Sequence, residues 1–346
     1  MKKFILKFSV FFIMLIIINQ VIIHFLPFWY GNPLFSLKLK YLKNNEDKYN
    51  TLFLGSSLIR RDIDPECFDK NTTIHTESFN LGTNGTFNPE SYYIYDYLLK
   101  KDSLKSKYIF LELQNNFLFF SWFLHTTKIR YWLNPRYFIY SLKILYYSNR
   151  PKKQKITEIG YCFASFFEKH FNIELYQGLK TDYYSKYKRY YEAYQPDKRE
   201  YNGYKPIETD NDINDLKARN LFLADTTQLT HRKEKSEQQF SNHNNLNFNK
   251  VFYEATMDLL ERSKEKGYHI IFLLLPQHDN YDELLPILEK LPEENKIELA
   301  NGNTYPELYI TENTYSLHHL NSKGAKIFSK SLAEKFNELV EKHDLQ

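Results

Sequence analysis

Cysteine, glycine and net charge are all scarce in this sequence, and each shortage excludes a class of protein. Only two cysteines occur among 346 residues, Cys67 and Cys162, so no disulfide framework can form, although the two could pair with each other outside the cytoplasm. No Cys and His residues have the spacing of a zinc site, and we expect neither a metal nor a cofactor. The 46 basic and 42 acidic residues leave a net charge of only +4, and without a basic stripe we expect no nucleic-acid partner. The ten glycines form neither of the common nucleotide-binding motifs, which disfavours a phosphate- or nucleotide-binding domain.

The most pronounced feature that is present is an apolar run from Phe8 to Leu26. As a helix this run would be about 28 Å long, close to the thickness of a bilayer core. Lys2, Lys3 and Lys7 precede it and the aromatic residues 28–30 follow it. This pattern predicts a single-pass anchor in the cell membrane, with the N-terminus in the cytoplasm and the main domain outside. A cleaved signal peptide is the alternative, but the run is long for one and no Ala-x-Ala-like site follows it.

After this run, short apolar segments alternate with helical patterns. The predicted strands are Tyr49–Leu54, Thr76–Leu81, Lys107–Leu113 and His269–Leu275, and the predicted helices are Leu34–Asn45, Glu90–Lys100, Phe248–Lys266 and Asn321–Val340. Strands that are apolar on both faces indicate a buried parallel sheet, and their alternation with helices indicates a layered α/β fold. In such a sheet, ligands bind beyond the carboxyl ends of the strands.

The alternation stops after the third predicted strand, where we predict an insertion. The chain then divides into a cytoplasmic stub and anchor (residues 1–33), an α/β domain (34–114 and 247–346) and an aromatic-rich, mainly helical insertion (115–246). Within the insertion, the Tyr-rich stretch 183–205 is either a half-buried helix with a loop or a surface that stacks on sugar rings. The polar segment 208–245 is predicted to be flexible or loosely folded.

Three short motifs stand where ligand-binding residues are expected. Gly55-Ser56-Ser57 follows the first predicted strand, Asn80-Leu81-Gly82 ends the second, and the run from His319 to Ala325 (HLNSKGA) opens the last helix. In this order they resemble the sequence blocks of the SGNH (GDSL-like) hydrolase family, over roughly residues 48–114 and 247–340. The resemblance is to the membrane-anchored, extracytoplasmic branch, which includes polysaccharide O-acetylation proteins and the D-alanyl transfer proteins of teichoic acid systems. It implies a three-layer, flavodoxin-like fold.

The resemblance also implies a serine-dependent site. Ser57 corresponds to the nucleophile, and His319 to the base that activates its hydroxyl. The backbone N–H groups of Ser57 and Gly82 would stabilise the oxyanion. Asn115 stands nearest to the asparagine that the family adds, although the Gly-x-Asn-Asp block itself is missing. Each residue also has a plain structural reading, Ser57 as a turn or helix-cap residue and His319 as a helix-start residue.

One position departs from the family pattern. The family has an aspartate three residues before the histidine, and this chain has Ser316 there. Loss of an orienting carboxylate can cost on the order of 10⁴ in turnover. Three outcomes stay open: Ser316 or a backbone carbonyl holds the imidazole, Glu312 reaches in from the preceding loop, or the site is degenerate and kept for binding. Gln277 and His278, after the fourth predicted strand, are further residues that would line the cleft.

Two functional hypotheses from different classes follow. The first is an extracytoplasmic serine esterase or O-acyltransferase that removes or adds a small acyl group, such as acetyl, on a cell-envelope polysaccharide through an acyl-Ser57 intermediate. For a transferase, the resemblance implies a multi-spanning membrane acyltransferase as the partner. The second is a catalytically degenerate protein of the same fold that binds cell-surface polysaccharide or helps to assemble it.

Overall fold

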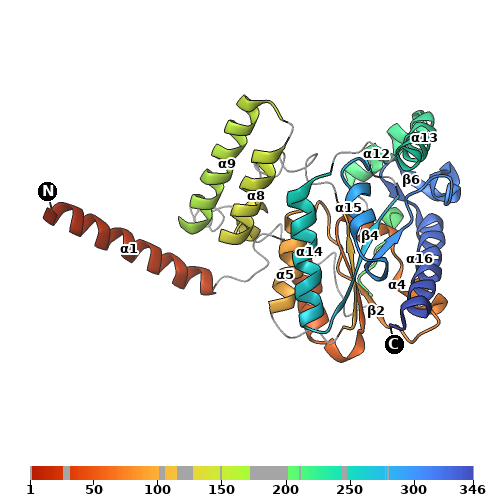
Figure 1. Cartoon of the computed structure of the whole chain (residues 1–346), viewed down its shortest axis with the longest axis horizontal. Helices are drawn as coiled ribbons and strands as arrows, with labels where there is room; N and C mark the ends of the chain where they lie inside the picture. The colour runs from red at the N-terminus through yellow and green to blue at the C-terminus, as the bar shows by residue number, and fades with distance from the viewer. Residues whose placement is uncertain are drawn as a thin grey trace. The chain divides into compact units, whose positions relative to one another are not determined.

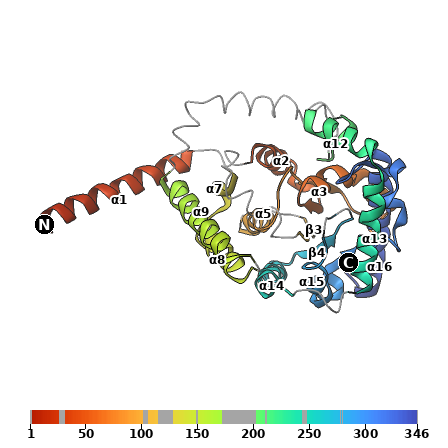
Figure 2. The same ribbon diagram turned by 90° about the horizontal axis from the view of Figure 1, so that it is seen from above.

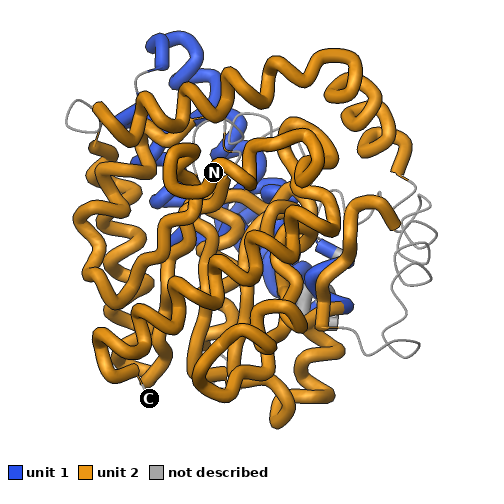
Figure 3. The backbone as a smooth tube through the Cα atoms, turned by 90° about the vertical axis from the view of Figure 1, so that its right-hand side faces the viewer, with its two compact units in different colours: residues 1–37, 117–198 blue, residues 38–116, 199–346 orange. Residues whose placement is uncertain are grey.

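A computed structural model describes residues 2–25, 32–100, 106–114, 128–148, 150–171, 202–209, 212–242, 248–276, 278 and 280–345. The chain divides into two compact units, which Figure 3 shows in different colours. The first unit comprises residues 1–37 and 117–198, and the second comprises residues 38–116 and 199–346. The second unit therefore contains the α/β segments and also residues 199–246, which the sequence pattern assigns to the insertion.

The first unit is helical throughout its described part, as predicted for the insertion. Its helices are α1 (Lys2–Phe25), α7 (Lys128–Trp132), α8 (Pro135–Tyr147) and α9 (Lys152–Phe171). Among the described helices, α1 alone is long and apolar enough to cross a membrane, and its position near the N-terminus also suits a signal sequence. Helix α9 contacts α1, α7 and α8. Most of the Tyr-rich stretch 183–205 lies outside the described residues.

The second unit is built on a five-stranded parallel sheet. Its strands are β1 (Thr51–Leu54), β2 (Ser78–Asn80), β3 (Tyr108–Glu112), β4 (His269–Leu274) and β5 (Lys296–Glu298), in the order β2-β1-β3-β4-β5. This is the strand order of flavodoxin-like sheets, so the predicted α/β fold with a parallel sheet is confirmed. The sequence did not indicate β5, because its Lys-Ile-Glu run is short and has a single apolar residue.

Helices cover both faces of this sheet (Figures 1 and 2). One face carries α5 (Glu90–Lys100) and α14 (Lys250–Glu265), and the other carries α4 (Pro65–Asn71) and α16 (Ser322–His343). Between the sheet and the second pair of helices the core is aromatic. Phe53 of β1 and Phe110 of β3 stack with ring centroids 4.9 Å apart, and Phe68 of α4 packs edge-on against both. Phe336 of α16 completes this cluster at 5.2 Å from Phe110.

Further helices, one antiparallel strand pair and short 3₁₀ turns complete the described part of the chain. They are the helices α2 (Pro33–Lys43), α3 (Ser57–Asp62), α12 (Ile213–Ala224), α13 (Thr227–Ser241) and α15 (Leu285–Lys290), the antiparallel pair β6 (Thr314–Ser316) and β7 (His319–Leu320), and short 3₁₀ turns at Glu46–Lys48, Ile207–Thr209, Glu293–Asn295, Pro306–Tyr309 and Thr311–Asn313. Helix α12 contacts β6, and α13 contacts the turn Pro306–Tyr309.

The segment 208–245 is therefore not loosely folded, as its polarity suggested, but largely helical. Only a few apolar side chains anchor it, among them Phe222 of α12 and Leu229 of α13, which belong to the core of the second unit. Because two buried residues in two helices produce almost no periodic pattern, the sequence does not display this packing.

Candidate active site

The turn between β1 and α3 buries Ser56 and leaves Ser57 half-buried. Gly55 adopts a φ of +155°, a conformation that favours glycine. Ser56 is the N-cap of α3, and its Oγ accepts a hydrogen bond from the Leu58 N–H at 3.1 Å. Ser57 is the first residue of the helix and is half-buried, and no described residue forms a hydrogen bond with its hydroxyl. The capping role is thus filled by Ser56, and the Ser57 hydroxyl is left available for chemistry.

Glu112, at the carboxyl end of β3, holds the turn between β1 and α3 in place with two hydrogen bonds. Its Oε2 accepts the Ser56 N–H at 2.6 Å, and its Oε1 accepts the Ser56 hydroxyl at 3.1 Å. A Cβ on Gly55 would lie 2.4 Å from Oε2, so glycine is required for the carboxylate to come this close. The Glu112 side chain is fully buried, and burial raises its pKa to about 8 against the opposing effect of the Ser56 hydrogen bonds. Sequence reasoning missed this residue, because one acidic residue in an apolar strand has no motif.

His278 lies beside the same carboxylate. Its Nε2 is 3.8 Å from Glu112 Oε1, and its ring packs edge-on against Tyr281. The predicted position of His278 after β4 brings it to the carboxyl edge of the sheet, on the β3–β4 side of the Ser56 turn. A first histidine–carboxylate pair therefore adjoins the serine turn, and its members come from the ends of two neighbouring strands.

A second histidine–carboxylate pair forms at the other end of α3. His319 of β7 has its Nδ1 3.7 Å from Oδ1 of Asp62, the last residue of α3; the Asp62 side chain is buried and the His319 side chain is 13% exposed. Asp62 Oδ1 also accepts the Leu320 N–H at 3.2 Å, which ties the carboxylate to the histidine strand. Ser57 and Asp62 stand about 7 Å apart along the helix axis, and no hydrogen bond joins Ser57 to His319 in the described part of the chain.

The two residues considered for orienting His319 are placed differently from Asp62. Ser316 pairs with His319 through the backbone of the β6–β7 ladder and is buried. Glu312 lies in a 3₁₀ turn, and its backbone carbonyl accepts a hydrogen bond from the Asn321 side chain. The carboxylate that faces the imidazole is Asp62, which the sequence could not suggest because it is 257 positions away from His319.

Burial dominates the electrostatics of this pair. Desolvation, with a further contribution from Arg61 and Arg60, lowers the pKa of His319 to about 3. Desolvation also raises the pKa of Asp62 well above its usual value, although the Leu320 N–H and Arg61 oppose this shift. His319 is therefore a neutral imidazole at physiological pH, which is the form that can accept a proton.

Helices α12 and α13 hold the loop that carries the histidine. Arg219 donates to the carbonyls of Thr314 and Tyr315 at 2.8 and 2.7 Å, and its guanidinium lies over the Tyr315 ring. Arg232 donates to the Leu317 carbonyl. Charge-assisted hydrogen bonds of this kind are the stronger ones in proteins, so two helices outside the sheet set the position of β6 and β7.

At Gly82 the backbone passes so close to α3 that only glycine fits. An added Cβ would lie 2.5 Å from the Arg60 backbone nitrogen. Its N–H donates to the Asn80 side chain at 2.9 Å, so an oxyanion at this place would have to share that donor. The third predicted oxyanion residue, Asn115, lies outside the described residues.

A buried lysine braces the same loop. Lys38 of α2 is fully buried, and its ammonium donates to the carbonyls of Asn80, Gly82 and Gly203 at 2.9, 2.7 and 2.8 Å. Burial, with Arg60 and Arg61 nearby, holds the pKa of Lys38 well below its usual value. All three ammonium protons are used, so Lys38 ties three chain segments together at the end of β2.

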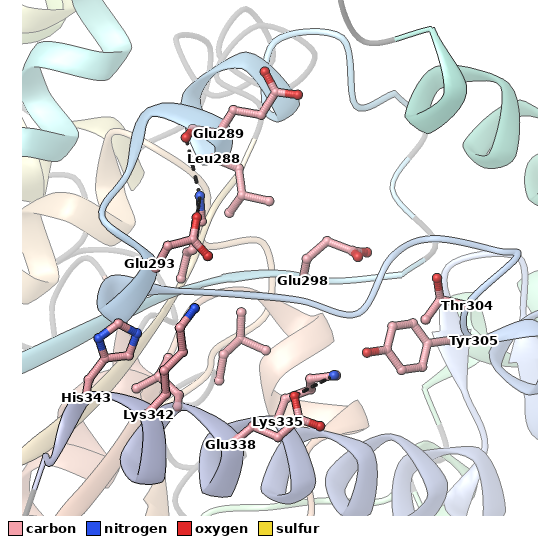
Figure 4. Close-up of a pocket in the computed structure, with 13 residues that line it drawn as sticks. Leu288, Glu289, Glu293, Glu298, Thr304, Tyr305, Lys335, Glu338, Lys342 and His343 are labelled. Atoms are coloured by element: carbon pink, nitrogen blue, oxygen red, sulfur yellow. Dashed lines mark hydrogen bonds and ion pairs between the residues drawn. The ribbon is translucent and has the colours of Figure 1, made fainter.

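A cavity of about 410 Å³ lies elsewhere, at the outer edge of the sheet (Figure 4). Residues of α15, β5 and α16 line it, including Glu298 and Lys342, together with Tyr305 before the turn Pro306–Tyr309. Many of its charged side chains pair with one another, as in the 2.7 Å contact between Lys335 and Glu338. None of the predicted site residues lines this cavity, and we assign it no role in the chemistry.

The described residues contain no group of three or more His, Cys, Asp or Glu side chains that could hold a metal ion. No protein-family model matches the sequence, and no curated protein is significantly similar to it. The site is thus defined by its own geometry: an available serine hydroxyl at the start of α3, with one histidine–carboxylate pair adjoining its turn and another at the end of the same helix.

Proposed function

We propose that this protein is a serine-dependent acyl-transfer enzyme of the SGNH type, which acts on acyl esters of a cell-envelope polysaccharide from the outer face of a membrane. The observation that carries the proposal is the Ser57 hydroxyl, half-buried and without a described hydrogen bond, at the start of a helix that follows the first strand of a parallel sheet. Ligands bind at this edge of α/β sheets, and a helix N-terminus favours developing negative charge.

The chemistry would proceed in two steps. Ser57 Oγ attacks the acyl carbonyl while its proton passes to a neutral imidazole, and collapse of the tetrahedral intermediate releases the alcohol, which takes that proton. Water or a sugar hydroxyl then attacks acyl-Ser57 and gives its proton to the imidazole. The bond between the acyl carbon and Ser57 Oγ breaks, the proton returns to Oγ, and the free acid or a new ester leaves. By resemblance the imidazole is that of His319, and Asp62 takes the place of the acid that the family has three residues earlier. His319 would have to approach Ser57, since catalytic hydrogen bonds are often long before substrate binds.

Labelling of the serine tests the proposal directly. A fluorophosphonate probe should modify the wild-type chain at Ser57, and the Ser57→Ala variant should not react. Ser322→Ala is a matched control, because Ser322 is also the half-buried first residue of a helix. The labelling rates of His319→Gln and His278→Gln are then compared. The substitution that slows labelling identifies the base. Equal labelling of wild type and Ser57→Ala would refute the proposed nucleophile.

A specific observation favours the second candidate function, a non-catalytic polysaccharide-binding protein of the same fold. His319 Nδ1 lies 3.7 Å from Asp62 at the far end of α3, and no hydrogen bond within the described residues joins it to Ser57. If wild type neither reacts with the probe nor hydrolyses acetyl esters, yet binds acetylated glycan, this candidate replaces the enzyme.

A further inference from the structure

One face of α9 in the first unit is apolar and exposed. Ile156, Phe163 and Phe167 are 71, 43 and 56% exposed. The exposed residues Gly160 and Ala164 lie between them. Steps of four, three, one and three residues put all five on one side of an α-helix. We call these five residues the α9 stripe.

The opposite face of α9 packs against the rest of the unit, and it carries polar residues beside the apolar Cys162 and Phe166. Glu158 is buried there and pairs with Arg150. Ser165 is also buried, and Lys169 donates to the Tyr131 carbonyl at 2.9 Å. A helix on the surface of a water-soluble domain typically has its apolar residues on the inward side, whereas α9 also carries the apolar stripe on its outward side. The orientation of α9 is fixed by these polar contacts, so the stripe is not turned outward by chance rotation of a loose helix.

The neighbours of the stripe indicate what covers it. Helix α1, whose large apolar side chains between Phe4 and Val21 are exposed, contacts α9 within the same unit. Lys152 and Lys153 are exposed at the N-terminal end of α9, within about one turn of Ile156. The stripe from Ile156 to Phe167 is about 16 Å long, too short to cross a bilayer core of about 30 Å. A short apolar stripe with lysines at one end suits a helix that lies in the membrane surface.

We propose that the α9 stripe lies in the headgroup–acyl boundary of the bilayer that α1 enters, so that the first unit rests on the lipid surface beside the anchor. Phe163 and Phe167 insert among the acyl chains, and Lys152 and Lys153 lie at the level of the lipid phosphates. This inference is independent of the chemistry at Ser57, and either can fail without the other.

Depth measurements on the full chain test the inference. The chain, including α1, is placed in nanodiscs of phosphatidylcholine and phosphatidylglycerol, in a Cys67→Ser, Cys162→Ala background. Spin labels at Phe163→Cys and Phe167→Cys are compared with a label at Gln154→Cys, an exposed polar position on the same helix. Oxygen and a water-soluble nickel chelate report depth. We expect the two stripe labels about 5–10 Å below the phosphates and the Gln154 label in water.

Two results would overturn the inference. If the stripe labels are as open to the nickel chelate as the Gln154 label, the stripe faces water. If they are shielded from both oxygen and nickel, a second copy or another protein covers it. Because labelling could disturb the helix, the unaltered chain is also exposed to a lipid that carries a diazirine on its acyl chain. Crosslinks to residues 156–167 are expected, and their absence, with crosslinks to α1 present, would count equally against the proposal.

Discussion

Replacement of Glu112 by Gln is expected to remove a large pH dependence from the stability of the Ser56 turn. The folded-state pKa of Glu112 is about 8 and its ordinary value is 4.5. Between these values the folded state binds the proton more tightly than the unfolded state, so stability is full below pH 4.5 and falls as the pH rises towards 8. This difference between the folded and ordinary pKa values corresponds to a loss of about 5 kcal/mol in stability across that pH range, at about 1.4 kcal/mol per pKa unit.

The amide that the Glu112→Gln substitution introduces can keep the local hydrogen bonds. Its oxygen can accept the Ser56 N–H and its nitrogen can donate to Ser56 Oγ, so the variant should fold with the turn intact. What the variant loses is the ionisation. The opening free energy of α3 and β3 in Glu112→Gln should therefore be nearly flat from below pH 4.5 to about pH 8.

Hydrogen exchange of the peptides that cover β1, α3 and β3 measures this opening free energy in the full chain. Glu254→Gln is the matched control, because Glu254 is an exposed residue of α14 that pairs with Lys250. We expect the control to retain the slope of the wild type. A wild-type chain without that slope, or a Glu112→Gln variant that keeps it, would refute the assignment of the raised pKa to this buried carboxyl.

Two further predictions concern the lysine brace and the second histidine pair. Lys38→Met leaves three buried carbonyls without the lysine donor, and each such loss costs about 1–3 kcal/mol. Denaturant unfolding of the second unit should therefore show that its free energy of unfolding falls by about 3 kcal/mol or more. Lys40→Met, on the exposed side of the same helix, should change this free energy little. Asp62→Asn should reduce ester turnover by a factor on the order of 10²–10⁴ and alter the tautomer of His319. In the wild type, NMR of the imidazole nitrogens should show a neutral ring throughout physiological pH. An unchanged tautomer and rate in Asp62→Asn would exclude Asp62 as the orienting residue.

Most of the sheet could be predicted from the sequence because its strands are buried on both faces. The four predicted strands appear as β1 to β4, with ends displaced by two residues or fewer. Helix α5 has the predicted bounds, and α16 ends three residues beyond the predicted Val340. Asn321 caps the start of α16 through the Gly324 N–H, as its sequence context suggests. Other elements had no clear pattern: β5 has a single apolar residue, and in α12 only Phe222 of its five large apolar side chains is buried.

The candidate site was predictable only where it follows a local motif. Ser57 and Gly82 follow strand ends, so their neighbourhood could be inferred from chain order alone. Glu112, Asp62 and Lys38 could not, because each acts across more than 40 residues of sequence on a partner that no motif identifies. Their burial, which is what perturbs their pKa values, is a property of the folded chain.

The lysine brace also limits where the site can work if α1 spans a membrane. Seven residues separate the end of α1 at Phe25 from the start of α2 at Pro33, and they reach about 30 Å at most when fully extended. Helix α2 adds less than about 10 Å before Lys38 is reached, and Lys38 is locked to the loop of Gly82. If α1 spans a membrane, the loop of Gly82 therefore lies within about 40 Å of the end of α1 at Phe25.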